Sequence, residues 1–434
     1  MSTGTDAAFA RDLVARALTE GADAAQAVTR EGTAFEVNFD TRRLTLLRSR
    51  GIDAATVTAF CRGRKGSATL TGRDPAAVAS AVRGACAAAI ASPADPANGL
   101  AEDVATAPAS EIGATEADRE AMVQTALRHI EAVRLEYPLV HTREALYEFT
   151  DVTRSFASSA GVTRCERRGY YRTFALFNAH RDGQATSMAH HGTAAFAPFA
   201  RLMDAGEFRR TFADASRSFD PQPVAVKFVG DIILMPEAVW EVLLGPLANA
   251  INGYALLAGT TPFRDRLGQA IAVPGLSMYN QPAAADLVYG AAFDDYGLDN
   301  RDLTVLRDGV LQNFLVDHYI ARKLGIPRTA GWWSFRVPGG SVPLADIVAA
   351  TRRGVIMTRF SGGVPSADLD FSGIAKNAFY IEDGEVRHPL RETMISGNLQ
   401  DLLPRIRALS RETSNRGGTD LPAIAVGGVT ISGK

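Results

Sequence analysis

The chain has 434 residues, of which 46% are hydrophobic and 22% are charged. This composition is typical of a globular protein large enough for two domains, and it excludes a disordered chain. Lys and Arg (46) nearly balance Asp and Glu (48), so the net charge of -2 lacks the basic excess that nucleic-acid binding usually requires.

In the first half, the pattern predicts a helix, a group of strands and two further helices. The start of the chain lacks the basic-then-apolar order of a secretory signal. Asp74 followed by Pro75 is a typical helix start. Helices are predicted over Ala7–Thr19, from Pro75 towards Ile90 and over Glu116–Val133; strands over Ala24–Arg30, Ala34–Phe39, Ala54–Arg62, Tyr170–His180 and Gln184–Ala195; and a surface connector over Ser92–Thr115.

The proline-containing segment Phe219–Pro223 predicts a boundary between an α+β domain over 1–222 and a strand-rich domain over 223–434. Asp-Gly pairs at Asp182, Asp308 and Asp383 predict tight β-hairpin turns. A strand is predicted over Val224–Met235, and helices over Pro236–Ala255, Asp317–Leu324, Leu344–Arg353 and Asn398–Leu409. We therefore expect an α+β protein of two domains, rich in β-hairpins and flanking helices, without an alternating βαβ series.

The cysteines and the apolar runs bear on the compartment. Cys61, Cys86 and Cys165 lie far apart, which argues against a disulfide framework and favours a reducing compartment. No run of about 18 uncharged apolar residues is present, so no membrane span is expected. We expect a cytoplasmic protein that binds neither membrane nor nucleic acid.

Two adjacent histidines, His190 and His191, invite a metal-site interpretation. On a strand, neighbouring side chains point to opposite faces, so the two cannot easily share one ion. If Asp182-Gly183 forms a two-residue turn, His190 pairs with Ala175, and His180 lies roughly 17 Å from His190. The simpler interpretation is that these are polar positions on strands.

The segment Pro236-Glu237-Ala238-Val239-Trp240-Glu241 carries the most information. Pro236 suits the first turn of a helix, and Glu237 lies favourably near the positive end of its dipole. Glu237 and Glu241 are four residues apart on one face, so they form either a solvated face or a pair that could hold a hard cation. No serine stands in the Gly-x-Ser-x-Gly pattern of hydrolases, and no histidine is followed by Glu.

The second half resembles the C-terminal region of the TldD/PmbA (TldE) family through several motifs in the family's order and spacing. The first half resembles the family less specifically, through Gly21-Ala22-Asp23-Ala24. The motifs are Phe293-Asp294-Asp295-Tyr296-Gly297, Asp308-Gly309-Val310-Leu311, Ala321-Arg322-Lys323-Leu324-Gly325, Ile381-Glu382-Asp383-Gly384-Glu385 and Ile395-Ser396-Gly397-Asn398-Leu399. Tyr296 replaces the family's glutamate.

The resemblance implies a degenerate metal motif. TldD-type chains hold zinc on a His-Glu-x-x-x-His helix and a cysteine near the C-terminus, whereas TldE-type chains lack these ligands. Here Pro236 and Glu241 stand where the two histidines would be, Glu237 matches the general base, and Thr413–Pro422 contains no cysteine. A catalytic zinc site usually has three protein ligands, and all three are replaced. No metal and no catalytic residue are expected on this chain.

The resemblance also implies a partner. A TldD-like subunit would hold the zinc, and the pair would process or degrade unfolded or extended peptides, as in the maturation of ribosomally made peptides. One alternative is an independent metallopeptidase that uses atypical ligands among Glu237, Glu241, His190 and His191. The other is a non-enzymatic binding protein.

Overall fold

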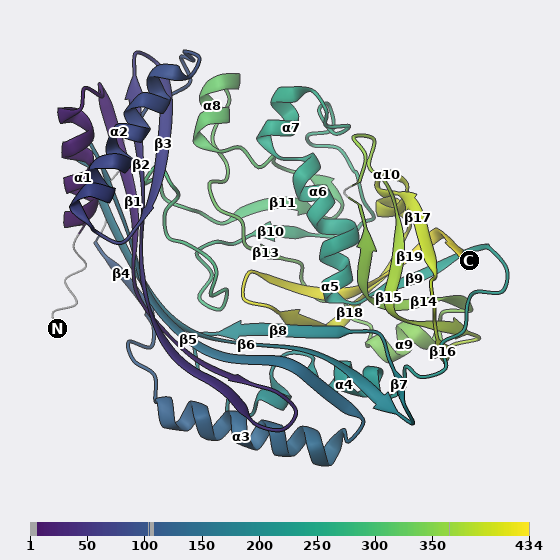
Figure 1. The fold of residues 1–434 in the computed structure, drawn as a ribbon. Helices are drawn as coiled ribbons and strands as arrows, with labels where there is room; N and C mark the ends of the chain where they lie inside the picture. The colour runs from purple at the N-terminus through teal and green to yellow at the C-terminus, as the bar shows by residue number, and fades with distance from the viewer. Residues whose placement is uncertain (1–6, 103, 105–107, 364, 434) are drawn as a thin grey trace.

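Long strands with alternating buried side chains build the first of two sheets (Figure 1). The computed structural model describes residues 7–102, 104, 108–363 and 365–433. The strand order is β3-β2-β1-β5-β6-β4, and β7 and β8 also pair with β6. The strands are β1 (Ala24–Phe39), β2 (Leu44–Cys61), β3 (Arg64–Thr71), β4 (Ser110–Gly113), β5 (Val140–Ser158), β6 (Thr163–Arg181), β7 (Gln184–Ala185) and β8 (Ala189–Ala195).

The helices of the first half cover one face of this sheet. α1 (Ala8–Thr19) and α2 (Pro75–Ala91) pack on the end formed by β1 to β3, where α2 begins at the Asp74 cap as predicted. α3 (Arg119–Glu136) and α4 (Phe208–Ser216) pack on β5 and β6. The second half of the chain lies over the opposite face, which is concave in Figure 1.

Strands of the second half form a separate eleven-stranded sheet. Within it β9, β14, β15, β17 and β19 close into a ring, because β19 pairs with both β17 and β9. The strands are β9 (Phe228–Leu234), β10 (Met278–Asn280), β11 (Leu303–Arg307), β12 (Val310–Leu311), β13 (Phe335–Arg336), β14 (Arg353–Gly362), β15 (Asp370–Glu382), β16 (Glu385–Pro389), β17 (Met394–Asn398), β18 (Ile406–Asn415) and β19 (Thr419–Ser432).

Short helices flank this second sheet. They are α5 (Pro236–Val239), α6 (Gly245–Ala250), α7 (Gly253–Ala258), α8 (His318–Leu324), α9 (Leu344–Ala349) and α10 (Leu399–Leu402). The expected strand-rich α+β fold is therefore confirmed, with hairpins at all three Asp-Gly pairs. At each of these turns both residues have positive φ, the conformation that Asp-Gly favours in a two-residue hairpin. The predicted boundary segment Phe219–Pro223 lies between the two sheets, and the division into domains at residue 222 stays a prediction.

Several predicted bounds were wrong. Ala24–Arg30 and Ala34–Phe39 are one strand, because the residues between them pair on both sides, with β2 and with β5. The helix expected over Asn398–Leu409 ends early: Pro404 lacks the N–H that continues a helix, and Ile406 begins β18. The helix expected over Leu344–Arg353 ends at Ala349, because Arg353 already pairs in β14.

The helix expected over Pro236–Ala255 is interrupted after Ala250, where Asn252 caps α7 as a new helix. The connector expected over Ser92–Thr115 includes β4, and its residues 103 and 105–107 lie outside the described residues, as do residues 1–6 at the start of the chain. No helix in the described part of the chain combines the length and the apolarity needed to cross a bilayer.

Candidate functional site

The segment Pro236 to Glu241 begins a helix at the centre of the second half. β9 lies between β14 and β19, and the chain leaves it at Met235, which has extended dihedral angles. Pro236 then occupies the first helical turn, where its missing N–H costs nothing. This arrangement points Glu237 out of the end of the sheet, towards β8 of the first half.

Glu237 is the centre of a buried charge cluster. One carboxylate oxygen, Oε1, lies 2.6 Å from Nε2 of His190, and Oε2 accepts a hydrogen bond of 2.7 Å from Nη1 of Arg416. Only 9% of the Glu237 side chain is exposed. Burial raises the pKa of Glu237, but the hydrogen bond from His190 and the charge of Arg416 outweigh it and hold the pKa at about 2. Glu237 is therefore an ionised partner in a salt bridge.

Arg416 reaches Glu237 from the tip of the hairpin between β18 and β19. The Arg416 N–H donates to the carbonyl of Thr419, which closes the tip. Thr193 on β8 donates to the carbonyl of Asn415 at 2.7 Å, so the tip is fastened to the first sheet. In Figure 1 the yellow hairpin extends alongside β8. The charge cluster thus joins three separate parts of the chain.

The two adjacent histidines diverge, as the strand geometry predicted. His190 faces Glu237, while His191 points into the core beneath, where its Nε2 accepts a hydrogen bond of 2.9 Å from the backbone N–H of Glu207. Burial lowers the pKa of His191 to about 3. His180 lies elsewhere, stacked on His141. The two neighbours cannot bind one ion.

The predicted pairing of His190 with Ala175 was wrong by one residue. His190 pairs with Leu176, and His191 pairs with Ala175. The turn at Asp182-Gly183 has two residues as expected, but the ladder breaks between β7 and β8. One extra residue enters the chain there, which shifts every later pair.

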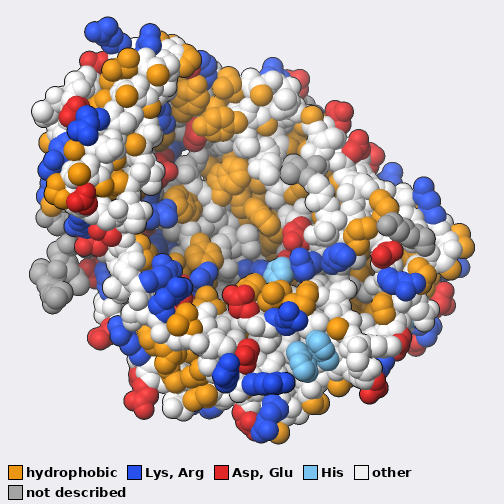
Figure 2. Space-filling view, viewed as in Figure 1, with side chains coloured by type: hydrophobic (Ala, Val, Ile, Leu, Met, Phe, Trp, Pro, Cys, Tyr) orange, Lys and Arg blue, Asp and Glu red, His pale blue; other side chains and the backbone are white. Residues whose placement is uncertain are grey.

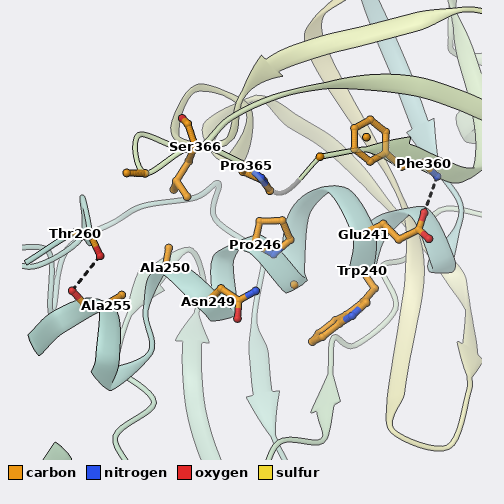
Figure 3. Close-up of a pocket in the computed structure, with 15 residues that line it drawn as sticks. Trp240, Glu241, Pro246, Asn249, Ala250, Ala255, Thr260, Phe360, Pro365 and Ser366 are labelled. Carbon is orange, nitrogen blue, oxygen red and sulfur yellow. Dashed lines mark hydrogen bonds between the residues drawn. The ribbon is translucent and has the colours of Figure 1, made fainter. Parts of the chain in front are cut away.

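Glu241 lies one turn beyond Glu237 and has a different environment. Its Oε2 accepts a hydrogen bond of 2.6 Å from the backbone N–H of Phe360 on β14. Burial raises the pKa of Glu241, and the nearby negative charge of Glu237 adds to this. Glu241 and Trp240 line a cavity of about 510 Å³. Figure 3 shows Phe360 and Ser366 across this cavity from the helix. The two carboxylates therefore do not share a site.

A π-helical turn, Trp240–Leu244, joins α5 to α6. Its N–H to carbonyl bond runs from Gly245 back to Trp240, five residues away. Pro246 explains this turn, since it has no N–H and its ring displaces the carbonyl of Val242. A side chain at position 245 would meet the Trp240 carbonyl at 2.7 Å, so glycine is needed there.

The residues at the degenerate motif do not fit a zinc ion. Pro236 offers no donor atom, Glu241 binds a backbone N–H, and the carboxylate of Glu237 already holds the cationic Arg416. Within the residues that the structure describes, no three His, Cys, Asp or Glu side chains gather as a metal site would require. Of the set Glu237, Glu241, His190 and His191, which the independent metallopeptidase would need, only His190 and Glu237 are in contact; Glu241 and His191 bind backbone N–H groups elsewhere. The three cysteines are buried away from this helix.

Sequence reasoning placed Pro236, Glu237 and Glu241 on one helix but missed the partners of Glu237. His190 was interpreted as a polar strand position, and Arg416 was only part of a segment without cysteine. The Asn415-Arg416-Gly417-Gly418 turn was the available signal, because it presents a cation at a hairpin tip. Arg416 and Glu237 are separated by 179 positions in the sequence, so no local pattern predicts their contact.

Comparisons with known proteins agree with this architecture. Residues 229–433 match the family described as the PmbA/TldA metallopeptidase C-terminal domain. The chain is 27% identical over 196 residues to metalloprotease PmbA of Escherichia coli, covering 44% of this chain and 43% of that protein. It is 28% identical over 220 residues to a PmbA homologue of Haemophilus influenzae, covering 49% and 48%. The matches thus span less than half the length of these relatives.

The fold extends the likeness to the whole chain. The crystal structure of TldE from Thermococcus kodakarensis superposes with a TM-score of 0.80 at 19% identity and covers 98% of this chain and 99% of that one. At 19% sequence identity, this similarity shows a shared fold and nothing further.

Proposed function

We propose, because this chain belongs to the TldD/PmbA family, that it is the TldE-like, non-catalytic subunit of a two-chain zinc metallopeptidase. In this proposal the zinc is held by a TldD-like partner, and this chain holds none. The pair processes or degrades unfolded or extended peptides in the cytoplasm. The chain's own contribution is to enclose the reaction site and to bind part of the peptide.

The salt bridge between Glu237 and Arg416 carries the proposal. Glu237 stands where the resemblance places the general base of a metallopeptidase, and such a base acts on a metal-bound water. Here its two oxygens face a histidine nitrogen and a guanidinium, and its pKa of about 2 makes it a very weak base. A carboxylate in this state stabilises the fold and is unsuited to proton transfer at neutral pH.

The hollow between the two halves supports a role in binding. Figure 2 shows this hollow beside the first sheet, with basic side chains along its lower rim and apolar side chains inside. An extended peptide could enter such a space and pair with an exposed strand edge. A partner that covers the opening would exclude water from the substrate, as zinc hydrolysis in a shaped cavity requires.

Association with the TldD-like partner is the first expected result. A permanent subunit is expected to form an interface above about 1,000 Å² with an apolar centre. Such an interface is stable, so co-expressed chains should purify as one complex. Native mass spectrometry checks this. A strictly monomeric protein that ignores a TldD-like chain from the same genome would contradict the proposal, whereas a homodimer formed without the partner would agree with it.

A further inference from the structure

A second cavity, of about 400 Å³, lies on the face of the first sheet that also carries His190. His190 pairs with Leu176, and Arg172, Tyr170 and Arg168 precede Leu176 at every second position along β6. Alternate residues of a strand share a face, so these side chains face the second half together with His190. The other wall of the cavity comes from Val288–Ala291 and Trp332.

The charge of this cavity is unusual for a sheet face that another part of the protein covers. Its lining includes two glutamates and five arginines, namely Arg30, Arg50, Arg154, Arg168 and Arg172. Four of these arginines are paired with a carboxylate, and two of the four, Arg154 and Arg168, are buried. Their carboxylate partners are Glu36 for Arg50 (2.8 Å), Asp295 for Arg154 (2.6 Å), Glu166 for Arg168 (2.6 Å) and Glu148 for Arg172 (2.7 Å).

Two of the paired arginines hold the cavity together. Arg154 also donates to the carbonyl of Phe293 at 2.7 Å, and its guanidinium lies over the ring of Trp332. Glu166 accepts hydrogen bonds from the N–H of Ala292 as well as from Arg168. These contacts fix the 288–295 segment against β5 and β6. The cavity is therefore formed before any ligand binds.

Arg30 differs from the other four. It lies on β1, where its backbone pairs with β2 and β5, but its exposed side chain makes no hydrogen bond or ion pair with another described residue. It also lines the adjoining cavity of about 590 Å³ near Lys65 and Tyr296. Arg30 thus supplies one uncompensated positive charge where the two cavities meet.

Aromatic side chains provide the apolar part of the wall. Tyr170 and Tyr289 meet edge to face with ring centroids 5.6 Å apart, and the indole N–H of Trp332 donates to the carbonyl of Tyr289. A cavity of this size that combines an apolar wall with placed charged groups is typical of small-ligand recognition. Rings beside a guanidinium suit a group with an apolar stem and an anionic end.

We propose that this cavity binds a carboxylate group of a peptide, with Arg30 forming the ion pair and the aromatic wall covering the neighbouring part of the chain. A guanidinium binds a carboxylate through two parallel hydrogen bonds, and one unpaired arginine matches its single charge. The carboxylate belongs either to an acidic side chain or to the peptide's C-terminus. The proposal rests on the proposed function only in taking the ligand to be a peptide.

The test is calorimetric titration of the full chain, without any partner, with four acetylated hexapeptides of one sequence. They carry a central Glu or Gln, and each has a free or an amidated C-terminus. At least one carboxylate-bearing peptide should bind about tenfold or more tightly than the neutral one, since a charge-assisted hydrogen bond contributes about that factor. The two singly charged peptides tell which carboxylate is bound.

Arg30→Gln should lower the affinity for that peptide to the level of the neutral one. Arg83→Gln, an exposed arginine on the outer helix α2, is the matched control and should leave binding unchanged. Equal affinity for all four peptides, an absence of binding, or full binding by the Arg30 variant would overturn the proposal. Because no partner is present, this result is independent of the cleavage assay. Binding without partner-dependent cleavage would support this site and count against the proposed function, and the reverse outcome would do the opposite.

Discussion

Under the proposed function, peptide cleavage is expected only when this chain is combined with a TldD-like partner. Zinc hydrolysis needs an open coordination position and a polarised water, and the motif helix here offers neither ligands nor a free base. Mass spectrometry of a peptide library incubated with each chain, then with both, measures this. In the mixture, changing the partner's motif glutamate to Gln should lower turnover by about 10²- to 10⁴-fold, the usual contribution of a general base.

The control for this assay lies in the present chain. Glu237→Gln should leave turnover by the assembled pair unchanged when it is measured below the unfolding temperature of the variant. Glu237 is engaged by Arg416 and has no proton-transfer role in the proposal. Cleavage by this chain alone, lost in Glu237→Gln, would contradict the subunit assignment and support an independent metallopeptidase.

A large loss of stability is expected for Glu237→Gln itself. The substitution leaves Arg416 partly buried without a counter-charge, and breaking such a pair costs about 3 kcal/mol of unfolding free energy. Arg416→Gln should cost a smaller amount, because His190 still contacts Glu237. The double variant should lose less than the sum of the two, since the partners are coupled. Urea unfolding of the three variants measures this.

An exposed ion pair of the same sheet is the matched control for that cycle. Arg387 and Glu385, both on β16, form an ion pair in which both side chains are exposed (42% and 66%). Exposed pairs contribute about 0–1 kcal/mol, so Arg387→Gln should change stability little. Equal losses of stability for Arg387→Gln and Glu237→Gln would show that burial adds nothing to the contribution of the Glu237–Arg416 pair.

The same cluster predicts a pH dependence. The pKa of Glu237 is about 2 in the folded chain, against an ordinary value of 4.5, so the unfolded chain binds the proton first as pH falls. The contribution of ionised Glu237 to the unfolding free energy is therefore complete above pH 4.5 and is lost as pH falls from 4.5 towards 2. The gap corresponds to about 3 kcal/mol. The unfolding free energy of Glu237→Gln should lack this component, and equal slopes for both proteins below pH 4.5 would contradict it.

Local rules predicted most of the elements. The Asp74 cap, the three Asp-Gly turns and the strand over Tyr170–His180 each depend on a few neighbouring residues, and each is present in the structure. Rules of this kind failed where tertiary pairing decides. The helix predicted over Asn398–Leu409 ran into the first residues of β18, because the local pattern does not show the ladder between β18 and β19.

The candidate site divides in the same way. Pro236 predicts the start of the helix that carries Glu237 and Glu241. The family resemblance identifies this helix as the position of the degenerate zinc motif. The partners of Glu237 come from β8 of the first half and from the tip of the β18–β19 hairpin, and both contacts depend on tertiary packing of segments far apart in the chain. The arginine cavity was missed for a similar reason. Arg30 and Arg172 are 142 residues apart, and a charged strand position is ordinarily interpreted as solvent-facing.

The zinc content of the purified chain tests the central claim most directly. The chain should be expressed alone, purified gently without chelator and measured by elemental analysis against its protein concentration. With Pro236 and Glu241 at the ligand positions and Arg416 on Glu237, we predict no stoichiometric zinc. About one zinc ion per chain, retained through gel filtration, would contradict this assignment, because the chain would then hold a metal site on residues other than those expected.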